Sequence, residues 1–230
     1  MHKHKFIFAA FLLVVGTHLF NQFHGNVFLH QLSKLLILPL LILYYFRASK
    51  LGGNAISFMV ILALFFSFLG DTLLMYVHIA ESYFLAGLVA FLLAHVAYIF
   101  VYRQFRHADA ANALQGVRRV RMAFPIVLAG SGLVIVLYPH LDKLLWPVII
   151  YATVIVWMTL NALFRYGRTN ALSFWLVFFG ALFFMLSDSM LAINKFMLPF
   201  DYAGFFVMFT YITAQYLIVE GLLQHRIDSK

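Results

Sequence analysis

Lys34, Asp71 and Asp188 are ionisable side chains that stand inside long apolar stretches of the chain. An aspartate or lysine near the centre of a membrane-spanning helix costs about 2.5–3.5 kcal/mol even on lenient insertion scales, so such residues normally pair with one another or serve a function. A structural ion pair that only fixes helix packing is one interpretation. Because one lysine cannot neutralise two aspartates, we favour a functional role for the set.

Two carboxylates close together in a low-dielectric medium differ in proton affinity, so one is ionised, especially beside Lys34, and the other holds its proton. An acid and a base in one pocket suit hydrolysis through an oxocarbenium-like intermediate, and they suit proton-coupled transport equally well. Asp71 lies about six residues before the outer end of its apolar stretch and Asp188 about five. We therefore expect both carboxylates at a similar depth, with Lys34 in the same layer.

Further polar side chains fall on two other apolar stretches. His95 shares a helix face with Tyr98 at i+3, and Tyr211 and Gln215 are spaced four residues apart on the last stretch. Such groups line a polar pocket or form hydrogen bonds between helices, and both interpretations stay open.

Asn194 and Lys195 follow Asp188 at the outer end of its stretch. A phosphate or lipid headgroup at the outer mouth of the pocket is one predicted contact for these two residues. An interfacial anchor is the alternative.

These residues must be positioned by membrane helices. Of the 230 residues, 64% are hydrophobic and 10% are charged, and the mean hydropathy is +0.94. Soluble domains have roughly 45–50% apolar and about 25% charged residues. We predict one all-α, integral-membrane domain over residues 1–230, a bundle of eight transmembrane helices. The apolar stretches run over 6–20, 28–46, 55–77, 82–102, 123–138, 144–164, 171–193 and 202–222.

Basic residues gather on one side of this bundle. Thirteen of the sixteen lysines and arginines fall before the first stretch or after an even-numbered one, and only Lys143 and Lys195 fall on the other side. Cationic loops stay cytoplasmic, so both termini are expected in the cytoplasm of a multi-pass protein of the inner cell membrane. Contact with anionic lipids accounts for the basic loop 103–121, and we expect no nucleic-acid partner.

Several chemistries find no support in the sequence. Cysteine is absent, which excludes a disulfide framework and a cysteine nucleophile. The histidines show no paired spacing for a metal site, and neither a nucleophile elbow nor a nucleotide-binding loop occurs. We expect no metal and no cofactor.

An internal repeat links the two aspartates. Residues 65–74 read FFSFLGDTLL and residues 182–191 read LFFMLSDSML, which aligns Asp71 with Asp188 at an offset of 117 residues. The halves 1–110 and 118–230 are therefore predicted to be related. Because each half contains an even number of spans, the two would be parallel.

Four segments carry a resemblance to a known family: FSFLGDTLLM, FLLAHVAYI, GALFFMLSDSMLAINKF and YITAQYLIVEG. Together they resemble the YhhN family of membrane proteins, which includes lysoplasmalogenases. The resemblance implies hydrolysis of the alkenyl ether bond of a lysophospholipid, lysoplasmalogen. The products would be a fatty aldehyde and glycerophosphoethanolamine or glycerophosphocholine.

The residues fit that reaction in the following way. The neutral aspartate of the pair Asp71 and Asp188 would be the general acid, and the ionised one would stabilise the oxocarbenium ion and orient water. Lys34 would adjust the proton affinity of the ionised aspartate. The expected pocket residues are His95, Tyr98, Tyr211 and Gln215, with Asn194 and Lys195 at the headgroup phosphate.

Two other classes stay open. A proton-coupled transporter also places acids in the membrane, but the prolines do not break helices at matching positions of the two halves. A membrane protein that binds lysolipid without turning it over is the third class.

Overall fold

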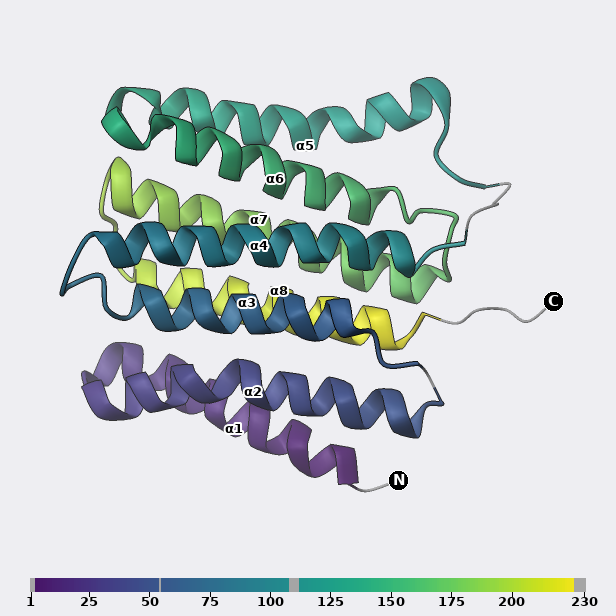
Figure 1. The fold of residues 1–230 in the computed structure, drawn as a ribbon, viewed down its shortest axis with the longest axis horizontal. Helices are drawn as coiled ribbons and strands as arrows, with labels where there is room; N and C mark the ends of the chain where they lie inside the picture. Colours follow the sequence, from purple (N-terminus) through teal and green to yellow (C-terminus); the bar gives the residue numbers. More distant parts are fainter. Residues whose placement is uncertain (1–2, 54, 108–111, 226–230) are drawn as a thin grey trace. The chain divides into compact units, whose positions relative to one another are not determined.

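The computed structural model describes residues 3–53, 55–107 and 112–225. Over these ranges the chain forms eight α-helices and two short 3-10 turns, without a strand (Figure 1). Arg226 and Lys230, two cations used to predict the orientation, lie outside the described residues, as does part of the basic loop 103–121. The helices are α1 (Lys3–His24), α2 (Val27–Leu51), α3 (Phe58–Leu74), α4 (Ser82–Gln104), α5 (Gly116–Leu137), α6 (Leu145–Leu163), α7 (Ala171–Phe196) and α8 (Ala203–Leu223).

Seven of these helices are long and apolar enough to cross a membrane, and α3 is apolar but has 17 residues. At about 1.5 Å per residue α3 is some 25 Å long, slightly less than a hydrocarbon core of about 30 Å. Large apolar side chains such as Leu13 and Ile135 are 70% and 71% exposed, which suits a surface that faces lipid. The predicted all-α multi-pass membrane bundle is confirmed.

Helix ends differ from the limits of the apolar stretches. The first stretch was predicted to end at Phe20, but α1 continues to His24 because a helix stops where its backbone turns, here at Gly25 with φ of 68°. Conversely, α3 ends at Leu74, before the predicted Val77, and turns follow. Asp71 is thus three residues from the end of α3 and Asp188 eight from the end of α7, in place of the six and five residues predicted from the apolar stretches. Their similar depth stays a prediction.

The chain divides into two compact units, residues 1–98 and 99–230, and the boundary falls inside α4. In the first unit α1 and α2 form a hairpin, and α3 packs against α2. The Tyr45 hydroxyl on α2 accepts a hydrogen bond of 3.1 Å from the Ser57 amide at the start of α3. The predicted repeat halves 1–110 and 118–230 stay a prediction.

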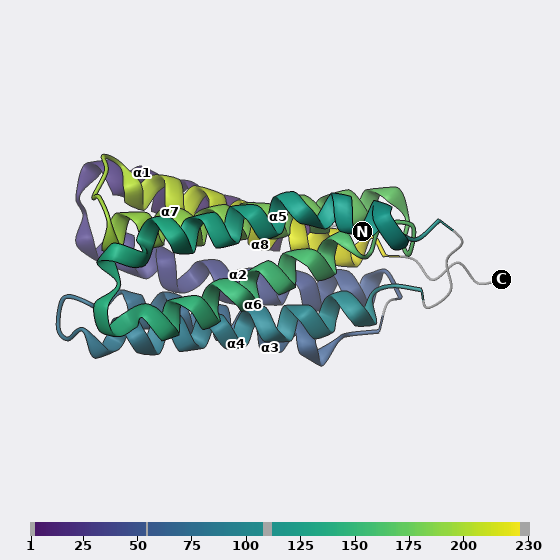
Figure 2. The same ribbon diagram turned by 90° about the horizontal axis from the view of Figure 1, so that it is seen from above.

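In the second unit α5 and α6 form a hairpin and α7 packs closely along α8 (Figure 2). Glycines allow this close packing. A Cβ on Gly180 of α7 would lie 2.7 Å from the Ile218 side chain and 3.0 Å from the Ala214 carbonyl oxygen, both on α8. A Cβ on Gly221 of α8 would likewise lie 2.7 Å from Val177. Small residues at a helix crossing let backbones approach and gain dispersion contacts, which drive association in lipid.

Arg165, just after α6, is fully buried and forms hydrogen bonds to other segments of the second unit. Its guanidinium donates to the carbonyl oxygen of Phe105 and to the carbonyl and hydroxyl oxygens of Ser173, at 3.0, 3.2 and 2.7 Å. The Ser173 hydroxyl in turn donates to the Gly221 carbonyl at 2.6 Å. Burial lowers the pKa of Arg165 to about 10, so the side chain remains charged at neutral pH.

Candidate active site

Lys34 and Asp71 meet in the first unit. The Lys34 ammonium nitrogen on α2 lies 3.9 Å from the Asp71 carboxylate oxygen Oδ1 on α3, and the two side chains are 14% and 6% exposed. This contact was predicted from the cost of leaving either charge alone in lipid. A nearly buried carboxylate is thus held beside a cation.

One face of α3 places Asp71 in the interior. The buried residues of α3 recur every three or four positions, as Val60, Ala63, Leu64, Ser67, Gly70 and Asp71. This spacing marks one side of a helix. A Cβ on Gly70 would lie 2.6 Å from the ring of Phe91 on α4, so glycine lets that ring pack against the backbone beside the carboxylate.

His95 and Tyr98 are both fully buried on α4, as expected for pocket or core residues. Both belong to the first unit, together with the Lys34–Asp71 pair. Their role in lining a pocket stays a prediction.

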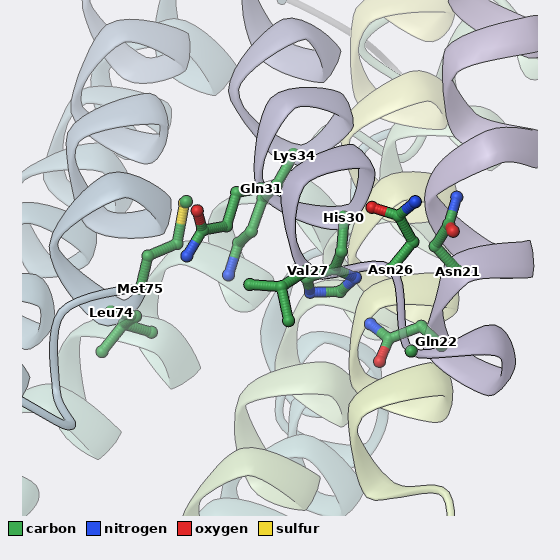
Figure 3. Close-up of a pocket in the computed structure, with 10 residues that line it drawn as sticks. Asn21, Gln22, Asn26, Val27, His30, Gln31, Lys34, Leu74 and Met75 are labelled. Atoms are coloured by element: carbon green, nitrogen blue, oxygen red, sulfur yellow. The ribbon is translucent and has the colours of Figure 1, made fainter.

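A pocket of about 380 Å³ lies next to the ion pair in the first unit (Figure 3). The end of α1, the start of α2 and the end of α3 form its walls, and Lys34 lines it. The sequence interpretation missed this pocket. Its polar residues lie at helix ends, where polar residues are common and carry no signal of their own.

Asp188 has a different partner in the second unit. The hydroxyl of Tyr151 on α6 donates a hydrogen bond to the carboxylate oxygen Oδ2 of Asp188 on α7. Tyr151 was not predicted as a site residue. A tyrosine in a membrane helix is compatible with lipid and with the protein interior, so its position along the sequence does not single it out.

Tyr211 and Gln215 are buried on α8, with exposures of 3% and 0%. The Tyr211 ring packs edge-on against Phe184 of α7 at a centroid distance of 5.5 Å. Next to Asp188, the Ser187 hydroxyl donates to the Val207 carbonyl of α8 at 3.0 Å. These contacts fix the rotation of α7 against α8.

Asn194 and Lys195 lie in the last turn of α7. The Asn194 side-chain oxygen accepts a hydrogen bond of 3.3 Å from the Phe200 amide, which shapes the turn into α8. Lys195 is exposed. The predicted headgroup contact of these two residues stays a prediction.

The structure thus brings Lys34 to Asp71 and Tyr151 to Asp188. Asp71 belongs to the first unit and Asp188 to the second, and their action as one pair stays a prediction. An ammonium beside one carboxylate and a phenol beside the other give the two acids different environments. Different environments are what allow two carboxylates to take the roles of acid and base.

Among the described residues no group of three or more His, Asp and Glu side chains is placed to hold a metal ion.

Comparison with known proteins identifies one family and several named relatives. The family model named "YhhN family" matches residues 29–222. A protein of Mycobacterium bovis named lysoplasmalogenase is 32% identical over 140 residues, which cover 60% of this chain and 50% of that protein. Lysoplasmalogenase TMEM86A of Homo sapiens is 30% identical over 173 residues, covering 73% and 66% of the two chains. Lysoplasmalogenase TMEM86B of Sus scrofa is 29% identical over 195 residues, covering 81% and 73%.

The chain thus spans between half and about two thirds of the length of the first relatives it matches. No solved structure matches it. Because the family model covers most of the chain, including Lys34 and both aspartates, the protein belongs to the YhhN family.

Proposed function

We propose that the protein is a lysoplasmalogenase, which hydrolyses the vinyl-ether bond of lysoplasmalogen to a fatty aldehyde and glycerophosphoethanolamine or glycerophosphocholine. The observation that carries the proposal is the presence of two intramembrane aspartates with unlike partners, the Lys34 ammonium for Asp71 and the Tyr151 phenol for Asp188. The names of the matched relatives support the same activity.

The reaction begins with transfer of a proton to the β-carbon of the vinyl ether. We assign this step to Asp188, which accepts the Tyr151 hydrogen bond on one oxygen and can carry a proton on the other. Protonation converts the C=C–O group into an oxocarbenium ion. Asp71, kept ionised by Lys34, stabilises this cation by its negative charge.

Water then adds to the carbon of the oxocarbenium ion, and a carboxylate accepts the proton that water loses. The hemiacetal so formed collapses when its hydroxyl proton is removed and the glycerol oxygen is protonated and leaves. The products are the aldehyde and the glycerophospho-alcohol. Atoms balance with one water consumed, and neither oxidant nor reductant is needed.

The remaining predicted residues take supporting roles in the proposal. His95, Tyr98, Tyr211 and Gln215 are buried in the two units and would line the substrate cavity or hold water. From their positions in the sequence, Asn194 and Lys195 would contact the lipid headgroup. The apolar helices would accept the single alkenyl chain of the lysolipid from the bilayer. The charge distribution supports placement in the inner cell membrane with cytoplasmic termini.

The test is aldehyde release by the purified chain in detergent, with lysoplasmenylethanolamine offered beside the matching ester lysolipid. We expect aldehyde from the vinyl-ether lipid, without any ion gradient. Asp71→Asn and Asp188→Asn should each lower kcat by about 10²–10⁴-fold, the usual contribution of general acid–base catalysis, while the fold is retained.

Absence of aldehyde from well-folded wild type would overturn the proposal. Uptake that needs sealed vesicles would then indicate transport, and binding without turnover would indicate a lysolipid-binding protein. Normal turnover in either asparagine variant would overturn the assignment of that aspartate.

A further inference from the structure

The pocket of about 380 Å³ beside the ion pair has a size typical of small-molecule sites, which measure about 300–1,000 Å³. It is lined by the last turns of α1, the first turns of α2 and the end of α3, all within the first unit. The proposed mechanism uses only Lys34 of these residues. The rest of the pocket is therefore without an assigned role.

The polar side chains that line this pocket are neutral or cationic. The pocket contains the amides of Asn21, Gln22, Asn26 and Gln31, the imidazole of His30 and the ammonium of Lys34. None of the described residues that line it is acidic. A cavity with amide donors and one cation favours an anion, because a cationic ligand would find no carboxylate there.

Two observations indicate which polar atoms remain for a ligand. The Asn26 side-chain oxygen caps α2 by accepting from the Leu29 amide at 3.0 Å, so this cap does not use the amide nitrogen of Asn26. The ring nitrogen Nδ1 of His30 is buried and lacks a hydrogen-bond partner in the protein. A buried polar atom without a partner costs free energy, which a ligand or water in the pocket would recover.

Gln31 and Lys34 are one helical turn apart on the same side of α2. Figure 3 shows both side chains extending toward Met75 at the end of α3, whereas His30 lies on the side of α1. Met75 and Leu74 come one turn after Asp71. Along the axis of α3, Leu74 and Met75 therefore lie about one helical turn, some 5 Å, beyond Asp71.

This distance matches the substrate of the proposed reaction. In a lysoplasmalogen the three glycerol carbons separate the ether oxygen from the phosphate. A vinyl ether placed at Asp71 puts the phosphate about one helical turn away, where Gln31 and Lys34 extend. Lys34 would then contact Asp71 on one side and the phosphate on the other.

We propose that this pocket binds the phosphodiester of the lysolipid headgroup, with Gln31 and Lys34 as its contacts, and so selects phosphate-bearing lipids. The proposal rests on the proposed function. It assigns the phosphate to the α1–α2–α3 pocket in place of Lys195 at the end of α7, the contact predicted from sequence.

The experiment compares two vinyl-ether substrates in mixed micelles at fixed mole fraction, lysoplasmenylethanolamine and 1-alkenylglycerol, which lacks the phosphate. Gln31→Leu should raise KM for the phosphate-bearing lipid about tenfold, the effect of losing one hydrogen bond to a charged group, and leave kcat unchanged. For 1-alkenylglycerol its KM should equal that of wild type.

Gln31→Glu is the second variant, since it keeps the size of the side chain and adds a negative charge that repels phosphate. Its KM for lysoplasmenylethanolamine should exceed that of Gln31→Leu. Gln115→Leu is the matched control, because Gln115 is exposed and its side chain does not cap α5. It should behave as wild type on both lipids.

The outcomes separate the two proposals. If wild type hydrolyses neither lipid, both the proposed function and the pocket assignment are wrong. If wild type is active but the Gln31 variants change KM for both lipids alike, or for neither, only the pocket assignment is wrong. If KM rises in Lys195→Ala for the phosphate-bearing lipid alone, and not in the Gln31 variants, the phosphate binds at the end of α7.

Discussion

Lys34 and Tyr151 stand 117 residues apart, and each contacts the aspartate that follows it by 37 residues, Asp71 and Asp188 respectively. The same offset of 117 residues aligns the two aspartates. Equivalent positions on α2 and α6 thus supply the partner of the acid on α3 and on α7. The correspondence supports the predicted repeat, with a lysine at this position in one half and a tyrosine in the other.

The Lys34–Asp71 pair yields a prediction about stability. Lys34→Met should lower the free energy of unfolding by about 3–5 kcal/mol, because it leaves a nearly buried carboxylate without its cation. Adding Asp71→Asn should restore most of that loss, since the amide carries no charge, while kcat should be lowered about 10²–10⁴-fold, as in Asp71→Asn alone. Thermal unfolding in detergent measures both variants. Additive losses in the double variant would contradict the pairing.

The Tyr151–Asp188 hydrogen bond yields a prediction about the rate. Tyr151→Phe should lower kcat about 10–100-fold with little change in KM, since it removes one hydrogen bond to the proposed acid without altering the cavity shape. Tyr138→Phe is the control, because Tyr138 is 63% exposed at the end of α5. An unchanged kcat in Tyr151→Phe would show that the phenol does not position Asp188.

The buried Arg165 yields a prediction about the loop between α6 and α7. Arg165→Lys should destabilise the protein by about 2–4 kcal/mol, because an ammonium cannot reach the Phe105 carbonyl and both Ser173 oxygens at once. Arg121→Lys, at an exposed position of α5, should fall within about 0.5 kcal/mol of wild type. Equal unfolding temperatures for the two variants would argue against a structural role of the Arg165 guanidinium.

The α7–α8 crossing yields a prediction about packing. Gly180→Ala should destabilise the protein by about 1–3 kcal/mol, since its Cβ would lie 3.0 Å from the Ala214 carbonyl oxygen and from the Ile218 amide nitrogen, and backbone atoms cannot rotate away. A Cβ on Gly132 of α5 meets no atom within 4 Å. Gly132→Ala should therefore be neutral or stabilising by up to about 1 kcal/mol. Unfolding temperatures in the reverse order would contradict this account.

The sequence alone determined the helices and the acids. Apolar stretches of about 20 residues must form helices in lipid, because a helix satisfies every backbone polar group within one segment. Asp71, Asp188 and Lys34 were recognisable because a charge in lipid is costly wherever it occurs, so its presence is informative without knowledge of its neighbours. Loop charges predicted an orientation because cationic loops stay cytoplasmic.

Tertiary structure alone decided the partners and the cavity. Tyr151 is compatible with lipid, and His30 and Gln31 lie near the start of α2, where polar residues are common, so their roles depend on which way each helix face turns. The α1–α2–α3 pocket forms because three helix ends meet, and helix ends are set by backbone turns such as Gly25, not by hydropathy. Rotation and approach of helices arise from contacts between residues far apart in sequence, including Gly180 with Ile218. A pattern read along one segment contains no information about such contacts.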